Sequence, residues 1–348
     1  MALSGVFKIF DQDSDVVKNI KSTISSGIWS GGSGTLSTYF TQSAQSSSTG
    51  EYYYDVYKTN PATDTEAEVQ FSITYGHLHG SGSLGTVGAA TGNRATVAIH
   101  SQFVNLLLGP LADRFTYAGD TSSKHFYAIS LKRARMREKV DPGNWELWLS
   151  GSSGVDETGQ TYWKLIDDSG ATVDPSVNKG GRVFNIVSGS LSSGVAETET
   201  AATSQPNGGL GLFYPDLGIW IISAAQADAS GSFGTDRGIT GAEDNLQKFY
   251  NAFVGGTKFQ ARREENISST HYFCRIRNKR YNFSNNPTFF TQSDGSFTNP
   301  SFHKDPKTYI TTVGMYNDEN ELLAVAKLSK PLLKSYAREA IIKVKLDF

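Results

Sequence analysis

The sequence contains one cysteine, Cys274, among its 348 residues. A single thiol excludes an intrachain disulfide and any metal site built from several thiolates. Lys and Arg together number 32 and Asp and Glu number 34, so the basic excess typical of nucleic-acid binding is absent. No apolar run approaches the roughly eighteen residues of a membrane span, and the start, MALSGVFKIFDQDSD, lacks the pattern of a signal peptide. We therefore expect folding in a reducing cytoplasm, without membrane or nucleic-acid partners.

Glycine and aromatic residues are abundant instead, with 35 Gly, 16 Tyr and 20 Phe. Gly/Ser-rich turns between Tyr- and Phe-rich strands predict an α+β fold that is predominantly β, with several antiparallel β modules and a few helices. At 348 residues the chain is longer than a single hydrophobic core usually accommodates, so we expect more than one packed region. We expect an α+β region at 1–125, a β-rich middle region at 126–240, and a helix with a C-terminal β module at 241–348.

Three helices are predicted from apolar periodicity. The first is capped by Asp13 or Ser14 and carries the stripe Val16, Val17, Ile20 and Ile24. The second begins at Thr91 or Asn93 and runs to about Leu108, with Val97, Ile99, Phe103, Val104, Leu106 and Leu107 buried. The third spans Ala242 to Val254, with Leu246, Phe249, Tyr250 and Phe253 on one face.

Two β-rich segments have clear turn signals. Residues 141–181 predict an inserted β unit that projects from the body, because DPGN at 141–144 and DDSG at 167–170 are typical turn sequences. Near the C-terminus, apolar runs at 309–316 and 322–328 flank NDEN, which indicates a hairpin. Residues 340–348 alternate apolar and charged side chains, as a half-buried strand does.

The segment 27–50 is rich in Gly, Ser and Thr and has two interpretations. Such a composition is typical of a flexible loop. The alternative is an arm that orders against a neighbouring subunit, because Trp29, Tyr39 and Phe40 are unusual in a plain linker.

The basic cluster KRARMREK at 132–139 also has two interpretations, a solvated face or an ion-pairing patch for an acidic neighbour. From side-chain type we select candidate protein-contact residues, since aromatic and arginine side chains dominate interfaces. They are Trp29, Tyr39, Phe40, Arg133, Arg135, Arg137, Trp145 and Trp148.

Candidate catalytic and metal-binding patterns are weak. His77 and His79 have no third ligand nearby, and the Gly-rich loop at 80–85 lacks a phosphate-binding lysine. The acidic pair at 167–168 falls in an expected turn, and Cys274 lacks an activating base, so we expect it to be a small buried side chain. We predict no catalytic residue, no cofactor and no metal.

Four segments carry a family resemblance: YNFSNNP at 281–287, DPKTYITTVGMYND at 305–318, ELLAVAKLSKP at 321–331 and RARMREKVDPGNWEL at 133–147. In their spacing and order they resemble virion structural proteins of contractile-tailed bacteriophages. The resemblance is spread from the middle of the chain to its end. It implies a non-enzymatic component of the virion tail, most simply of the baseplate wedge, that is assembled in the host cytoplasm and contacts other tail proteins and copies of itself.

Other functions compete with this expectation. A neck or fibre-attachment protein fits the same resemblance, and a host-recognition or carbohydrate-binding module would use exposed Trp and Tyr side chains to stack on sugars. A hydrolase acting on glycan or peptidoglycan would need two carboxylates facing one cleft.

Overall fold

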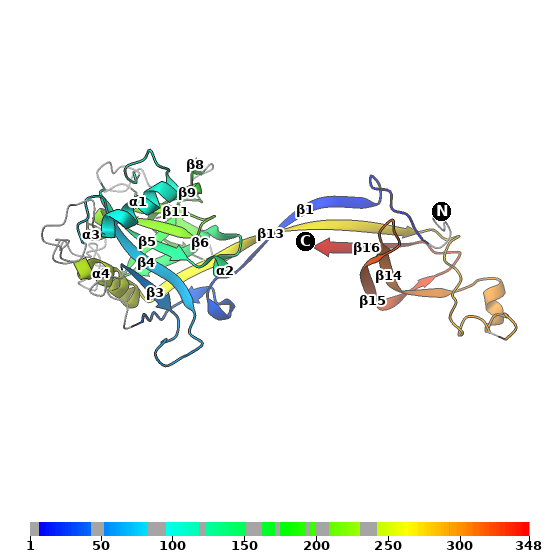
Figure 1. The fold of residues 1–348 in the computed structure, drawn as a ribbon. Helices are drawn as coiled ribbons and strands as arrows, with labels where there is room; N and C mark the ends of the chain where they lie inside the picture. The colour runs from blue at the N-terminus through cyan, green and yellow to red at the C-terminus, as the bar shows by residue number, and fades with distance from the viewer. Residues whose placement is uncertain are drawn as a thin grey trace. The chain divides into compact units, whose positions relative to one another are not determined.

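The computed structural model describes residues 7–42, 52–82, 95–117, 123–150, 162–170, 175–192, 195–198, 209–229, 242–291 and 293–347. The protein is 48% strand and 15% helix, which confirms the predicted α+β, mainly β fold. It divides into two compact units, residues 1–23 with 266–348 (unit 1) and residues 24–265 (unit 2) (Figure 1). The expected boundaries after residues 125 and 240 do not separate compact units, because strands on both sides of each boundary pair in one sheet.

Unit 2 is built on one antiparallel sheet with the strand order β13-β6-β7-β9-β11-β12-β5-β4-β3. A short segment closes this sheet on itself: Leu36 pairs with Phe259 of β13, and Phe40 bridges to Tyr57 of β3. The strands are β2 (Thr35–Leu36), β3 (Tyr53–Tyr57), β4 (Val69–His77), β5 (His125–Leu131), β6 (Lys139–Leu149), β7 (Trp163–Asp167), β8 (Ser176–Asn178), β9 (Gly181–Ser192), β10 (Val195–Thr198), β11 (Gly211–Tyr214), β12 (Ile219–Ser223) and β13 (Lys258–Ile276).

Several strands of unit 2 are buried on both faces. On β5, Tyr127 and Ile129 enter the main core, whereas Phe126 and Ala128 enter a second core beneath α1 (Ala95–Leu107). Because side chains alternate across a strand, both faces need apolar residues here, and β5 reads as a continuous apolar run. The remaining helical segments are η1 (Ser30–Gly32), α2 (Arg133–Met136), α3 (Ala224–Ala229), α4 (Ala242–Gly256) and η5 (Pro300–His303).

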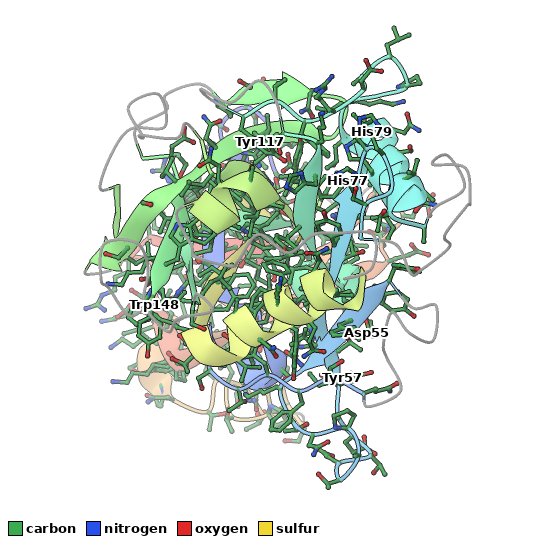
Figure 2. The ribbon with its side chains drawn as sticks, turned by 90° about the vertical axis from the view of Figure 1, so that its left-hand side faces the viewer. Asp55, Tyr57, His77, His79, Tyr117 and Trp148 are labelled. Atoms are coloured by element: carbon green, nitrogen blue, oxygen red, sulfur yellow. The ribbon has the colours of Figure 1, made fainter. Side chains whose placement is uncertain are left out.

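The helix predicted over Ala242–Val254 is confirmed as α4. Its apolar face packs Leu246, Phe249 and Phe253 into the main core, and Figure 2 shows this helix lying across the side chains of unit 2. In α1 the predicted burial is confirmed at Val104 and Leu107, but it is wrong at Leu106, which is 52% exposed because it lies away from the face that buries them. The other predicted positions, Val97, Ile99 and Phe103, are only partly buried. In the part of the chain that the structure describes, no helix is long and apolar enough to cross a membrane.

The helix predicted from Asp13 or Ser14 onward is wrong. Residues Val16–Gly27 form strand β1 instead, next to β13 in the sheet order. Val17 and Ile24 are both about half exposed, so the supposed apolar stripe is not buried. β-branched residues favour extended backbone, and pairing with a partner strand far away in sequence outweighs a weak helical period.

The Gly/Ser-rich segment is not a flexible loop over the described residues 27–42. Ile28, Trp29 and Leu36 are buried in the main core, and Tyr39 packs beside them. The segment therefore orders against its own chain rather than against a neighbouring subunit. Residues 43–50 lie outside the described residues.

The turn predicted at 141–144 is also wrong. These residues continue through β6, where Gly143 adopts a positive φ of 75° beside an irregularity in the pairing with β13. Glycine accepts this backbone conformation without strain, so DPGN makes a bulge rather than a reversal. The expected inserted unit does not project, because β6 and β7 are adjacent strands of the main sheet.

Unit 1 contains the C-terminal strands β14 (Thr308–Tyr316), β15 (Leu322–Lys334) and β16 (Ala340–Asp347). The predicted hairpin is confirmed: β14 and β15 form a two-stranded antiparallel sheet, and Asn320 takes a positive φ in the turn. β16 pairs with the later part of β13 and alternates as predicted, with Ile342 and Val344 buried. The hydrophobic core of unit 1 contains Cys274, Ile276, Met315, Ala340, Ile342 and Val344.

Candidate protein-contact surfaces

Three of the predicted contact residues lie in the core of unit 2. Trp29 is 2% exposed, and its indole N–H donates to the Phe259 carbonyl at 2.9 Å. Tyr39 packs against Phe253, and Trp145 is wholly buried against Phe213 and Trp220. Large aromatic side chains contribute most by burying area. These three side chains stabilise the core of unit 2 and are not available at the surface, so their selection as contact residues was wrong.

Trp148 lies partly buried on the outer side of β6 and is labelled in Figure 2. Its indole N–H donates to the Glu146 carboxylate, and its ring stacks on Tyr162 at 5.2 Å between centroids. The ammonium groups of Lys258 and Lys164 lie 4.6 and 4.9 Å from the ring centroid, within cation–π range. The ring is thus enclosed by its own chain. Phe40, by contrast, remains 36% exposed.

The arginines of the basic cluster each bind acceptors within unit 2. Arg135 donates to the Val69 carbonyl at 2.7 Å and pairs with Glu68 at 2.6 Å. Arg137 pairs with Glu265 at 2.9 Å, and Arg133 donates to a backbone carbonyl. The Arg137 side chain is 56% exposed, whereas that of Arg135 is only 11% exposed. Arg135 is therefore a structural link, whereas Arg137 remains accessible to a partner.

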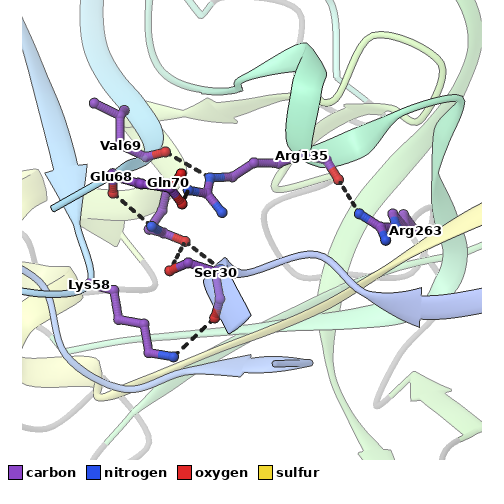
Figure 3. Close-up of polar contacts among 7 residues, drawn as sticks. All are labelled: Ser30, Lys58, Glu68, Val69, Gln70, Arg135 and Arg263. Carbon is purple, nitrogen blue, oxygen red and sulfur yellow. Dashed lines mark hydrogen bonds and ion pairs between the residues drawn. The ribbon is translucent and has the colours of Figure 1, made fainter. Parts of the chain in front are cut away.

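A polar network connects this cluster to the Gly/Ser-rich segment (Figure 3). Gln70 is fully buried, accepts from the Ser30 N–H at 2.9 Å and donates to the Glu68 carbonyl at 2.7 Å. Buried amides require such partners because an unmade hydrogen bond is costly. The same region includes bonds from Lys58 to Ser30 and from Arg263 to Arg135. The network explains why a Gly/Ser-rich segment can be ordered here.

The apolar surface of β14 and β15 was not selected from the sequence. Leu323 is 67% exposed and Val325 is 59% exposed, and Tyr309, Tyr316 and Leu322 are also exposed. The other face of the same hairpin packs Val313, Ala324, Ala326 and Leu328 on the core of unit 1. The signal was present in the sequence, because a two-sided apolar strand at 322–328 leaves one face without an internal partner.

Asp167 and Asp168 do not share one cleft. Asp167 is buried and accepts from the Gly143 N–H at 2.8 Å, and burial raises the pKa of its carboxyl. Asp168 accepts from the backbone and side-chain nitrogens of Asn185 and lines a cavity of about 240 Å³. Among the described lining residues Asp168 supplies one carboxylate. The cavity therefore gives no support to the hydrolase hypothesis, which requires a pair.

The remaining candidates from the sequence have ordinary environments. His77 stacks on His125 at 5.4 Å, and the described residues hold no group of three potential ligands placed for a metal ion. In the Gly-rich loop, residues 83–85 lie outside the described residues. Cys274 is buried as predicted, and burial raises the pKa of its thiol.

Comparisons with family models, with curated proteins and with solved structures found no match to this chain.

Proposed function

We propose that this protein is a non-enzymatic structural component of a bacteriophage contractile tail, in the baseplate, that acts by packing against other tail proteins and against copies of itself. The observation that carries this proposal is the exposed apolar face of β14 and β15, where Leu323 and Val325 are each more than half exposed. Contiguous apolar surface of this kind is typical of protein–protein contact sites.

The position of this face supports the proposal. Three of the four segments that resemble tail proteins, 281–287, 305–318 and 321–331, lie in unit 1, and two of them form the hairpin itself. The near balance of 32 basic and 34 acidic residues also suits dense packing of many copies, because net repulsion is small. Resemblance and exposed surface thus point to the same part of the chain.

The proposal is tested on phage particles whose genome encodes this chain. Purified virions are separated into heads, tails and isolated baseplates, and each fraction is analysed by quantitative mass spectrometry, with cryo-electron microscopy to locate the chain. We expect several copies per particle, enriched in the baseplate fraction. Enrichment in a neck or fibre fraction would move the protein to those assemblies, and its absence from mature particles would overturn the proposal.

A further inference from the structure

The hairpin of unit 1 presents a strand edge as well as an apolar face. In the described part of the chain, β15 pairs only with β14, so its other edge carries backbone groups without a strand partner. From residue 324 to residue 328 exposure alternates, with Val325 and Lys327 outward and Ala324, Ala326 and Leu328 toward the core. Such an edge can receive a further strand.

Charges along this edge are segregated. The turn end carries Asp318, Glu319 and Glu321, and the opposite end carries Lys327 and Lys330. Glu321 accepts from the Asn317 side chain at 2.8 Å, a neutral partner that leaves its charge uncompensated. Across the described residues, neither Lys327 nor Lys330 is within ion-pair distance of a carboxylate. The edge is therefore acidic at one end, apolar in the middle and basic at the other.

We propose that the occupant of this edge is the β15 strand of a second copy of the chain, antiparallel and related by a two-fold axis beside Ala324. This deepens the proposed function, on which it rests, by naming the self-contact. Antiparallel pairing about Ala324 places Glu321 opposite the partner's Lys327. It also places Leu323 opposite the partner's Val325. Two-fold symmetry repeats every contact, so each charge pair forms twice.

A second copy fits better than a dissimilar partner because the edge is complementary to itself. Glu321 and Lys327 lie three residues on either side of Ala324 on this edge. A shift of the axis by one residue loses the Glu321–Lys327 match. Opposite charges directly across antiparallel strands stabilise pairing, whereas like charges in that position weaken it.

The same features have a protective interpretation. Edge lysines, a bulge and proline commonly prevent strands from pairing with other chains. β15 has all three: its pairing to β14 is irregular between Met315 and Tyr316 and again between Ile310 and Thr312, and Pro331 lies inside the strand. Pro331 lacks an N–H and lies beyond the 321–327 overlap, so it limits the ladder without blocking it. A protected edge and a self-pairing edge respond differently to charge reversal, because only the self-pairing edge loses self-affinity when opposite charges become like charges.

The test is the self-association of the purified full-length chain, measured by sedimentation velocity over a range of concentrations. We expect a dimer that Glu321→Lys and Lys327→Glu each weaken at least about tenfold, because each single change creates two like-charge pairs in the symmetric contact. The double variant, Glu321→Lys with Lys327→Glu, restores the opposite-charge pairs and is expected to return the dissociation constant to near the original value. Circular dichroism and thermal unfolding verify that each variant folds.

Lys279→Glu is the matched control, because Lys279 is an exposed lysine of unit 1 outside the 321–327 overlap and its reversal changes net charge equally. A monomer at all concentrations, equal weakening by this control, or a double variant no better than the singles would each overturn the proposal. The outcome is separable from that of the proposed function. A chain present in particles but monomeric alone would refute only the β15 contact, whereas a dimer absent from particles would refute only the tail role.

Discussion

The buried Lys334 allows the most quantitative prediction. Its side chain is fully buried in unit 1, and its ammonium donates to the Asn278 carbonyl, the Asn282 side-chain oxygen and the Ser335 carbonyl at 2.9, 2.9 and 3.0 Å. These three acceptors match the three N–H groups of a protonated lysine. The perturbation is Lys334→Met, which keeps most of the apolar stem and removes the donors together with the charge.

The change in the free energy of unfolding depends on which acceptor loses its donor when the ammonium is removed. The Asn278 carbonyl keeps a bond from the Asn282 amide, and the Ser335 carbonyl keeps one from the Arg338 N–H. The Asn282 side-chain oxygen loses its donor, which costs about 1–3 kcal/mol. Three charge-assisted bonds, roughly 5–9 kcal/mol together, are offset by the several kcal/mol needed to desolvate an ammonium. We expect a net loss of about 2 kcal/mol in the free energy of unfolding.

The assay is urea unfolding followed by hydrogen-exchange mass spectrometry on peptides covering 277–284 and 332–336, because a global signal would mix two units. Lys279→Met is the matched control, since that side chain is exposed, and its expected effect is within about 0.5 kcal/mol. If Lys334→Met unfolded at the same urea concentration as the original protein, or at a higher one, the reasoning would be wrong. Relief from ammonium desolvation would then outweigh the three bonds.

Three further predictions concern unit 2. Burial lowers the pKa of His100 from 6.5 to about 4, with positive charge from Arg114 and His79 acting in the same direction. Below about pH 6.5 His100 is protonated in the unfolded chain but stays neutral in the folded chain until about pH 4. The free energy of unfolding therefore falls between pH 7 and 4, by at most about 3 kcal/mol. A urea series across this range checks it, and His100→Gln should flatten the dependence. Trp145→Ala should cost about 3–5 kcal/mol in chemical denaturation, and clearly more than Trp148→Ala, because Trp145 is wholly buried. Gly218→Ala should cost about 2 kcal/mol or more in thermal unfolding, because Gly218 has a φ of 65° and a Cβ there would lie 2.5 Å from the Met136 sulfur.

Where the sequence predicted structure correctly, the signal was local and strong. The apolar period of α4, the alternation of β16 and the Asn-rich turn between β14 and β15 each lie within one continuous stretch. In these stretches the residues that the local pattern marks as apolar are the ones that the fold buries, so the pattern alone predicts the element. The single thiol likewise excluded an intrachain disulfide, whatever the fold.

The remaining features depend on pairings between residues far apart in the chain. Leu36 pairs with Phe259, and Phe40 with Tyr57, and these contacts order a segment whose composition resembles a linker. β13 likewise holds β1 as a strand despite its weak helical period. The sequence by itself determined which residue types must be buried or must turn. The tertiary structure decided where Trp29 and Trp145 are buried and which strand leaves an apolar face exposed, because burial is set by all the neighbouring elements together.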